Sequence, residues 1–159
     1  MLYCSAILRN DAASRHGKGA YSVIIKKSPA EREAMKEAGR ISAKVLREVG
    51  RRVQPGVSTL ELDEFAETLI RLEGGVPAFK GYGGFPGSIC ASVNEQIVHG
   101  IPSAAVVLKE GDIISIDTGA VVDGWVGDNA WTYAVGTISP EKQRLLEVTE
   151  KCMWAGLDA

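Results

Sequence analysis

Apolar residues recur at helical spacing in two segments of the first half of the chain, each behind a helix start signal. The first segment follows Ser28-Pro29-Ala30-Glu31, a capping box with proline at the first helical position, and ends at Gln54-Pro55-Gly56. The second follows a further capping box, Ser58-Thr59-Leu60-Glu61, and ends at Gly74-Gly75. The pattern therefore predicts two amphipathic helices separated by a short turn.

Strand patterns follow in the middle of the chain. Residues 88–93 form a buried apolar run, and residues 96–99 are predicted to be a short extended return. Residues 112–122 and 125–135 are predicted to be two long strands around Asp123-Gly124, the strongest sequence signal for a two-residue hairpin turn. The middle of the chain is therefore predicted to contribute a sheet built around one long hairpin.

The two ends of the chain have different patterns. Residues 1–22 lack the apolar core of a signal peptide and are predicted to be a poorly structured extension, which leaves residues 23–159 as one domain. Ser139-Pro140 begins a last helix. We expect one side of this helix to face inward, with Leu145, Val148, Thr149 and Cys152.

Composition narrows the class of protein. The chain is 45% hydrophobic and 24% charged, a balance typical of soluble globular domains. A net charge of −2 gives no electrostatic reason for nucleic acid or an anionic membrane as the main ligand. No apolar run approaches the ~18–20 residues that span a bilayer. Three cysteines without a paired motif, Cys4, Cys90 and Cys152, fit a reducing compartment, so we expect a cytoplasmic protein.

Two aspartates lie on the predicted hairpin. The turn at Asp123-Gly124 sets a register that pairs Gly119 with Asp128 and Ala130 with Asp117. Both carboxylates then point to the same face as diagonal neighbours, ~7–8 Å apart. Like charges on a half-buried face repel, and hard oxygen ligands favour Mg, Mn, Fe(II), Co(II) or Zn. In the alternative reading, which a β-bulge would favour, one aspartate is solvated and the other caps a turn.

Two further features are candidates for a substrate site. His99 ends the predicted extended return and precedes a bend, so its ring could donate a hydrogen bond to a reacting carbonyl, or could simply be solvated. The segment 74–87 has no phosphate-binding signature but carries Phe79, Tyr82 and Phe85 at intervals of three residues between glycines. These aromatic residues could line an apolar pocket or pack as ordinary core.

Together these segments resemble the type I methionine aminopeptidases of the pita-bread metallohydrolase family, from about Val23 to the end of the chain. The stretches that carry the resemblance, in order, are Gly81-Tyr82-Gly83-Gly84-Phe85-Pro86, Ser92-Val93-Asn94-Glu95, His99-Gly100-Ile101-Pro102, Gly111-Asp112-Ile113-Ile114-Ser115-Ile116-Asp117 and Gly127-Asp128. The resemblance implies an α+β fold: the amino-terminal half of a pita-bread (creatinase/aminopeptidase) fold, with an antiparallel sheet and helices packed on one face.

The resemblance also implies roles for single residues. Asp117 would bind one of two divalent ions (Co, Mn, Fe or Zn), and Asp128 would bridge both. His99 would be a catalytic and substrate-binding residue near the scissile amide. Four residues match positions around the pocket for the methionine side chain: Phe79, Tyr82, Phe85 and Cys90.

The implied function is the metal-dependent removal of the initiator methionine from nascent polypeptides. Its partner is a peptide amino terminus that begins with Met; the ribosome and a second copy of the chain are further candidate partners. The complete site in the family also uses one histidine and two glutamates from a second half of the domain, which these 159 residues do not contain. We therefore expect the chain alone to be incomplete for catalysis. The alternatives are a non-catalytic pita-bread binding module and a relative that cleaves proline peptides.

Overall fold

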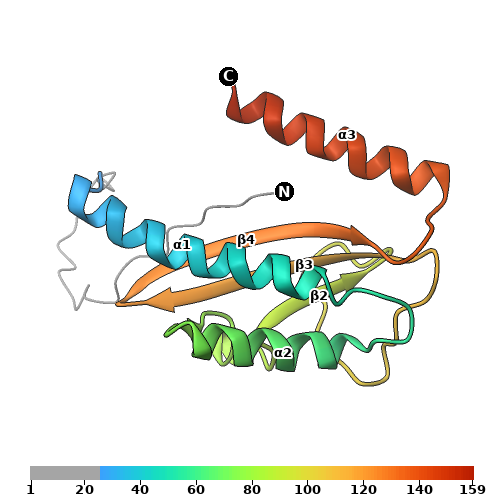
Figure 1. Ribbon diagram of the computed structural model, residues 1–159, viewed down its shortest axis with the longest axis horizontal. Helices are drawn as coiled ribbons and strands as arrows, with labels where there is room; N and C mark the ends of the chain where they lie inside the picture. The colour runs from blue at the N-terminus through green and yellow to red at the C-terminus, as the bar shows by residue number, and fades with distance from the viewer. Residues whose placement is uncertain (1–25) are drawn as a thin grey trace, which may run out of the picture.

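A computed structural model describes residues 26–159, so the extension predicted over residues 1–22 lies outside the described part. Helix α1 spans Pro29–Gly50 and helix α2 spans Thr59–Leu72 (Figure 1). Both begin with the predicted capping boxes, in which the Ser28 and Ser58 hydroxyls each accept from a backbone N–H three residues ahead. In this part of the chain no helix combines the length and apolarity needed to cross a membrane.

Four antiparallel strands form the sheet: β1 Val76–Pro77, β2 Ile89–Val93, β3 Ile113–Val122 and β4 Trp125–Ala134. β3 is central, with β4 along one edge and β1 and β2 along the other. The strand β1 was not expected from the sequence, since it lies inside the predicted glycine-aromatic loop. The extended return predicted over residues 96–99 forms no strand.

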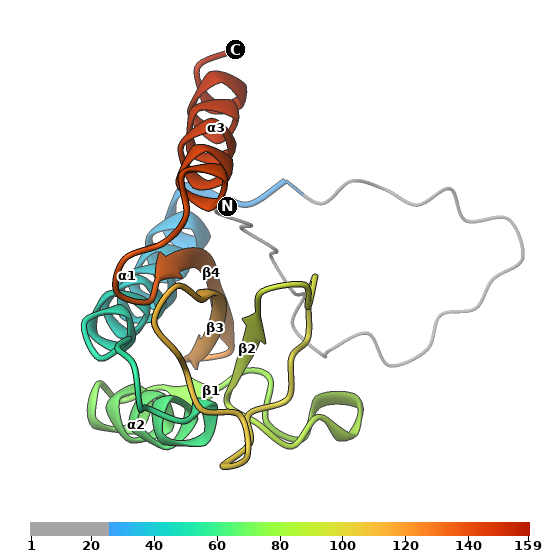
Figure 2. The same ribbon diagram turned by 90° about the vertical axis from the view of Figure 1, so that its right-hand side faces the viewer.

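Helices α1 and α2 cover one face of the sheet, and the hydrophobic core lies between these helices and the sheet (Figure 2). Alternate residues of β3, Ile114, Ile116 and Ala120, are fully buried on this face. Strand β4 lies very close to α1 at Gly127, where a Cβ atom would lie 2.2 Å from the carbonyl oxygen of Ala38. Only glycine allows β4 to lie this close to the helix. The contact fixes β4 so that Asp128, the next residue, points to the opposite face.

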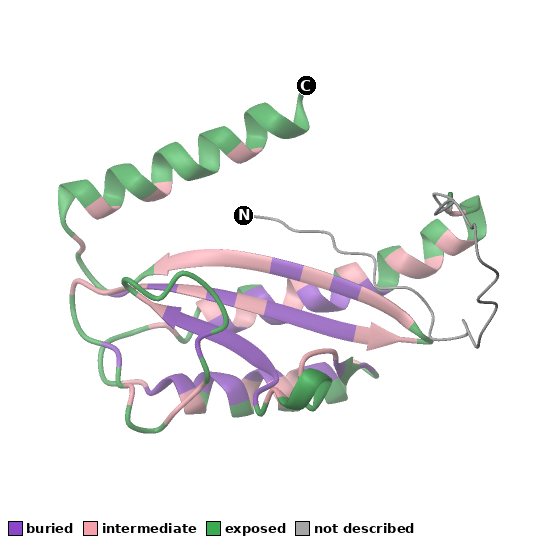
Figure 3. Ribbon diagram, turned by 180° about the vertical axis from the view of Figure 1, so that it is seen from behind, coloured by how far each residue is buried: buried purple, intermediate pink, exposed green. Residues whose placement is uncertain are grey.

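The last helix, α3 Pro140–Leu157, does not pack as expected. None of its residues is buried (Figure 3). Leu145 and Val148 are 56% and 46% exposed. Thr149 and Cys152, also expected to face inward, are exposed. The prediction was wrong because periodicity shows which side of a helix is apolar, but not whether another element lies against it.

Candidate active site

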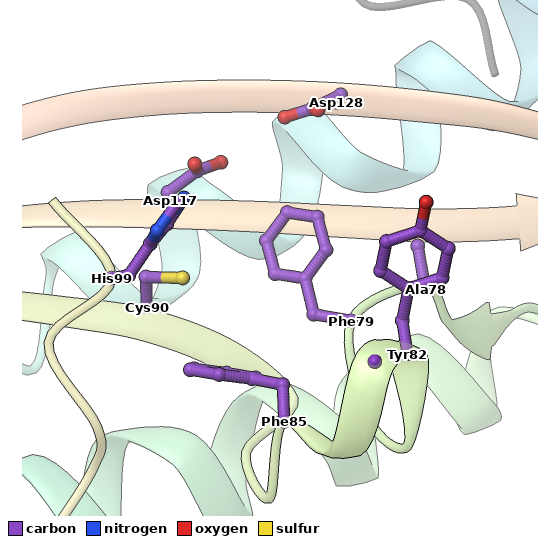
Figure 4. Close-up of a pocket in the computed structure, with 9 residues that line it drawn as sticks. Ala78, Phe79, Tyr82, Phe85, Cys90, His99, Asp117 and Asp128 are labelled. Carbon is purple, nitrogen blue, oxygen red and sulfur yellow. The ribbon is translucent and has the colours of Figure 1, made fainter.

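The two aspartates lie on the predicted face in the predicted register. β3 and β4 pair without interruption from Ile113–Ala134 to Val122–Trp125, with Asp117 opposite Ala130 and Gly119 opposite Asp128. Both carboxylates therefore point away from α1 and α2, and Figure 4 shows them on the same side of the hairpin. The unbroken register excludes the β-bulge that would have separated them.

The carboxylate pair is electrostatically unfavourable as it stands. The Oδ1 atom of Asp117 is buried and has no hydrogen-bond partner among the described residues. Burial raises the pKa of Asp117. Burial, together with the charge of Asp117, raises the pKa of Asp128 to about 7. A buried carboxylate oxygen without a partner is costly, and a divalent cation would supply both the missing partner and the neutralising charge.

The pair fits a metal ion by its chemistry, but it provides few ligands. Carboxylate oxygens are hard donors, suited to the divalent ions predicted from the sequence. Within residues 26–159, no group of three histidine, cysteine or acidic side chains is close enough together to hold a metal ion. A catalytic zinc ion usually has three protein ligands, so two aspartates are an incomplete set.

One cavity of about 430 Å³ brings the predicted site residues together (Figure 4). It lies on the face of the sheet that α1 and α2 leave open. Its lining contains all seven residues singled out from the sequence and two more: Phe79, Tyr82, Phe85, Cys90, His99, Asp117 and Asp128, with Ala78 and Gly83. Ala78 and Gly83 were missed because small residues in a loop carry no chemical signal of their own.

Phe79 reaches the carboxylates because Gly119 leaves room for its ring. A Cβ atom on Gly119 would lie 2.6 Å from Cε1 of Phe79. The backbone N–H of Ala78 donates to the Gly119 carbonyl at 2.9 Å, which fixes the chain beside the strand. A glycine inside a long strand often marks a close approach, and here it marks the aromatic wall beside Asp128.

His99 is held at the mouth of the cavity by its neighbour in sequence. Gly100 is buried, donates its N–H to the Ser92 hydroxyl at 3.0 Å and accepts from the Ala91 N–H at 2.9 Å. A Cβ atom on Gly100 would lie 2.3 Å from the Ala91 carbonyl oxygen, so this position requires glycine. His99 itself has a φ of 57°, a left-handed conformation that turns its exposed side chain toward the cavity.

Cys90 forms an apolar part of the wall. It lies on β2 directly opposite Asp117 on β3. Burial and the charges of Asp117 and Asp128 raise the pKa of its thiol to about 12. The thiol therefore stays protonated at neutral pH, which disfavours it as a nucleophile or metal ligand.

Comparison with known proteins gives a consistent set of relatives. The model of metallopeptidase family M24 matches residues 33–159. Methionine aminopeptidase 1 of Bacillus subtilis is 56% identical over 135 residues, which are 85% of this chain and 54% of that protein. Crystal structures of methionine aminopeptidases from Rickettsia prowazekii and Thermotoga maritima superpose with TM-scores of 0.81 and 0.79 at 36% and 43% identity. These matches cover 83% and 81% of this chain, and 53% and 52% of the two structures. The chain thus spans about half the length of these relatives.

Proposed function

The chain belongs to metallopeptidase family M24, and on that premise we propose that it provides half of the active site of a methionine aminopeptidase. In this role it takes part in the metal-dependent removal of the initiator methionine from polypeptides, with nascent chains, on or off the ribosome, as the substrates. The observation that carries the proposal is the single cavity in which the unpartnered carboxylate pair, His99 and the aromatic walls meet.

Asp117 and Asp128 are the proposed metal ligands. Two divalent ions, drawn from Co, Mn, Fe and Zn, would polarise the scissile carbonyl and lower the pKa of a bound water from 15.7 to about 7. Asp117 and Asp128 are the residues of this chain that would hold these ions. Both side chains must be deprotonated to bind, so the raised pKa of Asp128 makes binding depend on pH.

His99 is proposed to stabilise charge on the substrate and not to bind metal. It lines the cavity from the loop after β2, while both aspartates come from the hairpin. A ring N–H placed there can donate to the carbonyl oxygen as negative charge develops on it, and one such donor contributes ~2.7–4 kcal/mol in comparable sites.

The aromatic walls are proposed to select the side chain of the first residue. Tyr82 and Phe85 line the part of the cavity away from the sheet, and Phe79 lines the part against Gly119 of β3 (Figure 4). Thioether sulfur gains ~0.3–1.5 kcal/mol from each aromatic contact, which favours methionine over a hydrocarbon of similar length. The protonated Cys90 thiol adds a soft, uncharged surface to the same cavity.

The non-catalytic binding module is the weaker alternative. A binding surface gains nothing from two half-buried carboxylates whose pKa values are both raised by burial, whereas a metal site requires them. The other alternative, an enzyme that cleaves proline peptides, is distinguished by comparing the hydrolysis of X-Pro peptides with that of methionyl peptides.

The proposal is tested by joining residues 26–159 to the part of the Bacillus subtilis enzyme that this chain does not match. We expect the fusion to hydrolyse methionyl peptides with Mn(II) or Co(II), and the same fusion with Asp117→Asn to be inactive. The 159-residue chain alone is expected to show no appreciable turnover, because it supplies two ligands. Hydrolysis of X-Pro peptides in preference to methionyl peptides would overturn the proposed substrate. Inactivity of a folded, metal-loaded fusion would overturn the enzyme assignment.

A further inference from the structure

The segment from Lys80 to Ser88 carries two of the cavity's aromatic side chains but has little structure of its own. It contains one short 3-10 turn, Tyr82–Gly84, with Gly81 and Gly84 in left-handed conformations. Its internal bonds are local, such as the Gly81 N–H to the Phe85 carbonyl at 2.8 Å. The position of this segment relative to the carboxylates must therefore be fixed by contacts with other elements.

Helix α2 supplies those contacts through two acidic side chains one turn apart. The Glu67 carboxylate accepts from Lys80 Nζ at one end of the segment and from the Ser88 hydroxyl, at 3.2 Å, at the other. The Asp63 Oδ1 atom accepts from the backbone N–H groups of Ser88 at 2.7 Å and Ile89 at 2.9 Å. Both ends of the segment are thus attached to one face of α2.

Glu67 has more partners than the single one of an isolated surface ion pair. Its carboxylate also accepts from Arg71 at 2.8 Å, and Ser88 is completely buried. Hydrogen bonds from Lys80 and Arg71 lower the pKa of Glu67 to about 2, so it is charged at any working pH. Isolated exposed ion pairs contribute little, but a network that includes a buried partner restrains its members more strongly.

We propose that Glu67 is a positioning residue, which holds the segment from Lys80 to Ser88 on α2 and so sets the width of the cavity for the substrate's first side chain. This inference rests on the proposed function for its substrate, but not for the attachment itself. Lys80 lies between Phe79 and Tyr82 in sequence, so its bond to Glu67 restrains the aromatic residues on either side of it. Release of that bond would widen the cavity without moving Asp117 or Asp128, which lie on the hairpin.

The first test is hydrogen–deuterium exchange of the 159-residue chain. Glu67→Gln is expected to speed amide exchange in peptides covering residues 79–88 about fivefold, while residues 113–122 of β3 keep their wild-type rates. Glu64→Gln is the matched control, because Glu64 is an exposed residue on the same helix. Unchanged exchange over residues 79–88 in Glu67→Gln would overturn the proposal.

A second pair of variants covers the case in which Glu67→Gln disturbs the whole fold. Lys80→Gln removes the same ion pair from an exposed side chain and must by itself speed exchange over residues 79–88. If both act through one bond, the double variant exchanges no faster than the faster single variant. Additive effects would show that Glu67 and Lys80 act separately and would also overturn the proposal.

The selectivity of the cavity is measured on the fusion enzyme, with free L-methionine and L-leucine as probes, in the presence of Mn(II). Glu67→Gln is expected to weaken L-methionine binding about fivefold, to narrow its preference over L-leucine, and to leave Mn(II) affinity unchanged. Wild-type selectivity in a variant whose loop exchange has risen would overturn the role in setting the cavity's width. A wild-type fusion enzyme that binds neither amino acid would count against the proposed substrate, and the exchange rates would then decide the positioning role alone.

Discussion

The two faces of strand β3 differ in whether their buried polar groups have hydrogen-bond partners. On the face toward the helices, Thr118 is buried, and its hydroxyl and carbonyl both bond to Ser42 of α1, at 3.1 and 2.8 Å. On the other face the neighbouring residue, Asp117, has a buried oxygen without a partner among the described residues. One ten-residue strand thus stabilises the fold with one set of side chains and gives up stability with the other. Unsatisfied polar groups of this kind cluster at functional sites, and this contrast supports a metal-binding role for the open face.

The largest expected effect follows from removing a carboxylate from the open face. Asp117→Asn or Asp128→Asn should lower methionyl-peptide turnover of the fusion enzyme by ~10³-fold or more, because a ligand is lost from an already small set. The free energy of unfolding without metal should stay the same or rise, because one charge of a repelling pair is gone. Steady-state kinetics and urea denaturation measure the two quantities. A variant that keeps wild-type turnover would contradict the metal-binding role of the open face.

His99 tests whether the open face separates metal binding from substrate activation. His99→Ala in the fusion enzyme should lower kcat by ~10²–10³-fold, the loss expected for one hydrogen-bond donor to developing charge. Metal content, measured by elemental analysis, should stay at the wild-type value, since His99 is not a proposed ligand. Loss of metal in proportion to activity would show that His99 belongs with the aspartates.

The helix-side face should respond in the opposite way. Ile116 is completely buried, with 0% of its surface accessible, and it packs in the hydrophobic core. Ile116→Ala should cost ~2–5 kcal/mol of unfolding free energy by creating a cavity. Mn(II) affinity of the folded fraction should be unchanged, which isothermal titration at low temperature can measure. A change in affinity larger than the change in stability would show that the two faces are coupled.

The difference in how the two parts of the site could be predicted also has a physical basis. The register of Asp117 and Asp128 follows from the local turn at Asp123-Gly124, which fixes every pair along the hairpin. The capping boxes are local as well. The placement of Cys90 opposite Asp117 depends on pairing between distant strands, which no local pattern determines. For this residue only the family resemblance indicated the cavity.

The attachment of the segment from Lys80 to Ser88 to α2, and the exposure of α3, also depend on contacts between distant parts of the chain. Glu67 and Lys80 are thirteen residues apart, and nothing in the spacing of their charges shows that they meet. The strand β1 exists only because Val76 and Pro77 lie beside the end of β3. Proline is tolerated there because it is in a two-residue edge strand.

The pH dependence of stability gives a finer test of the open face. The pKa of Asp128 is raised from 3.8 to about 7, so the folded protein binds this proton more tightly than the unfolded chain. The stability that this proton contributes is complete below pH ~4 and is lost as the pH rises through 7. We expect a loss of ~1–3 kcal/mol over this range, discounted for the partial exposure of the side chain. Asp128→Asn should flatten the profile, and saturating Mn(II) should reverse its slope; a wild-type profile that is flat without metal contradicts the assignment.

The smallest expected effect concerns two surfaces outside the cavity, the outer edge of β4 and the apolar side of α3. Within the described residues β4 pairs only with β3, and α3 exposes Leu145, Val148 and Leu157. An open strand edge and exposed apolar side chains both favour association, so the 159-residue chain should form weak dimers at ~100 µM. Leu145→Glu should shift sedimentation toward monomer, and Arg144→Gln, which changes the net charge equally on the same helix, should not. Equal effects of the two variants would mean that charge and not apolar contact drives association, and a wild-type chain that stays monomeric would show that these surfaces are tolerated in water. Because the aspartates point away from α1 and α2 and not along the β4 edge, Mn(II) affinity should be the same in monomer and dimer, which separates association from metal binding.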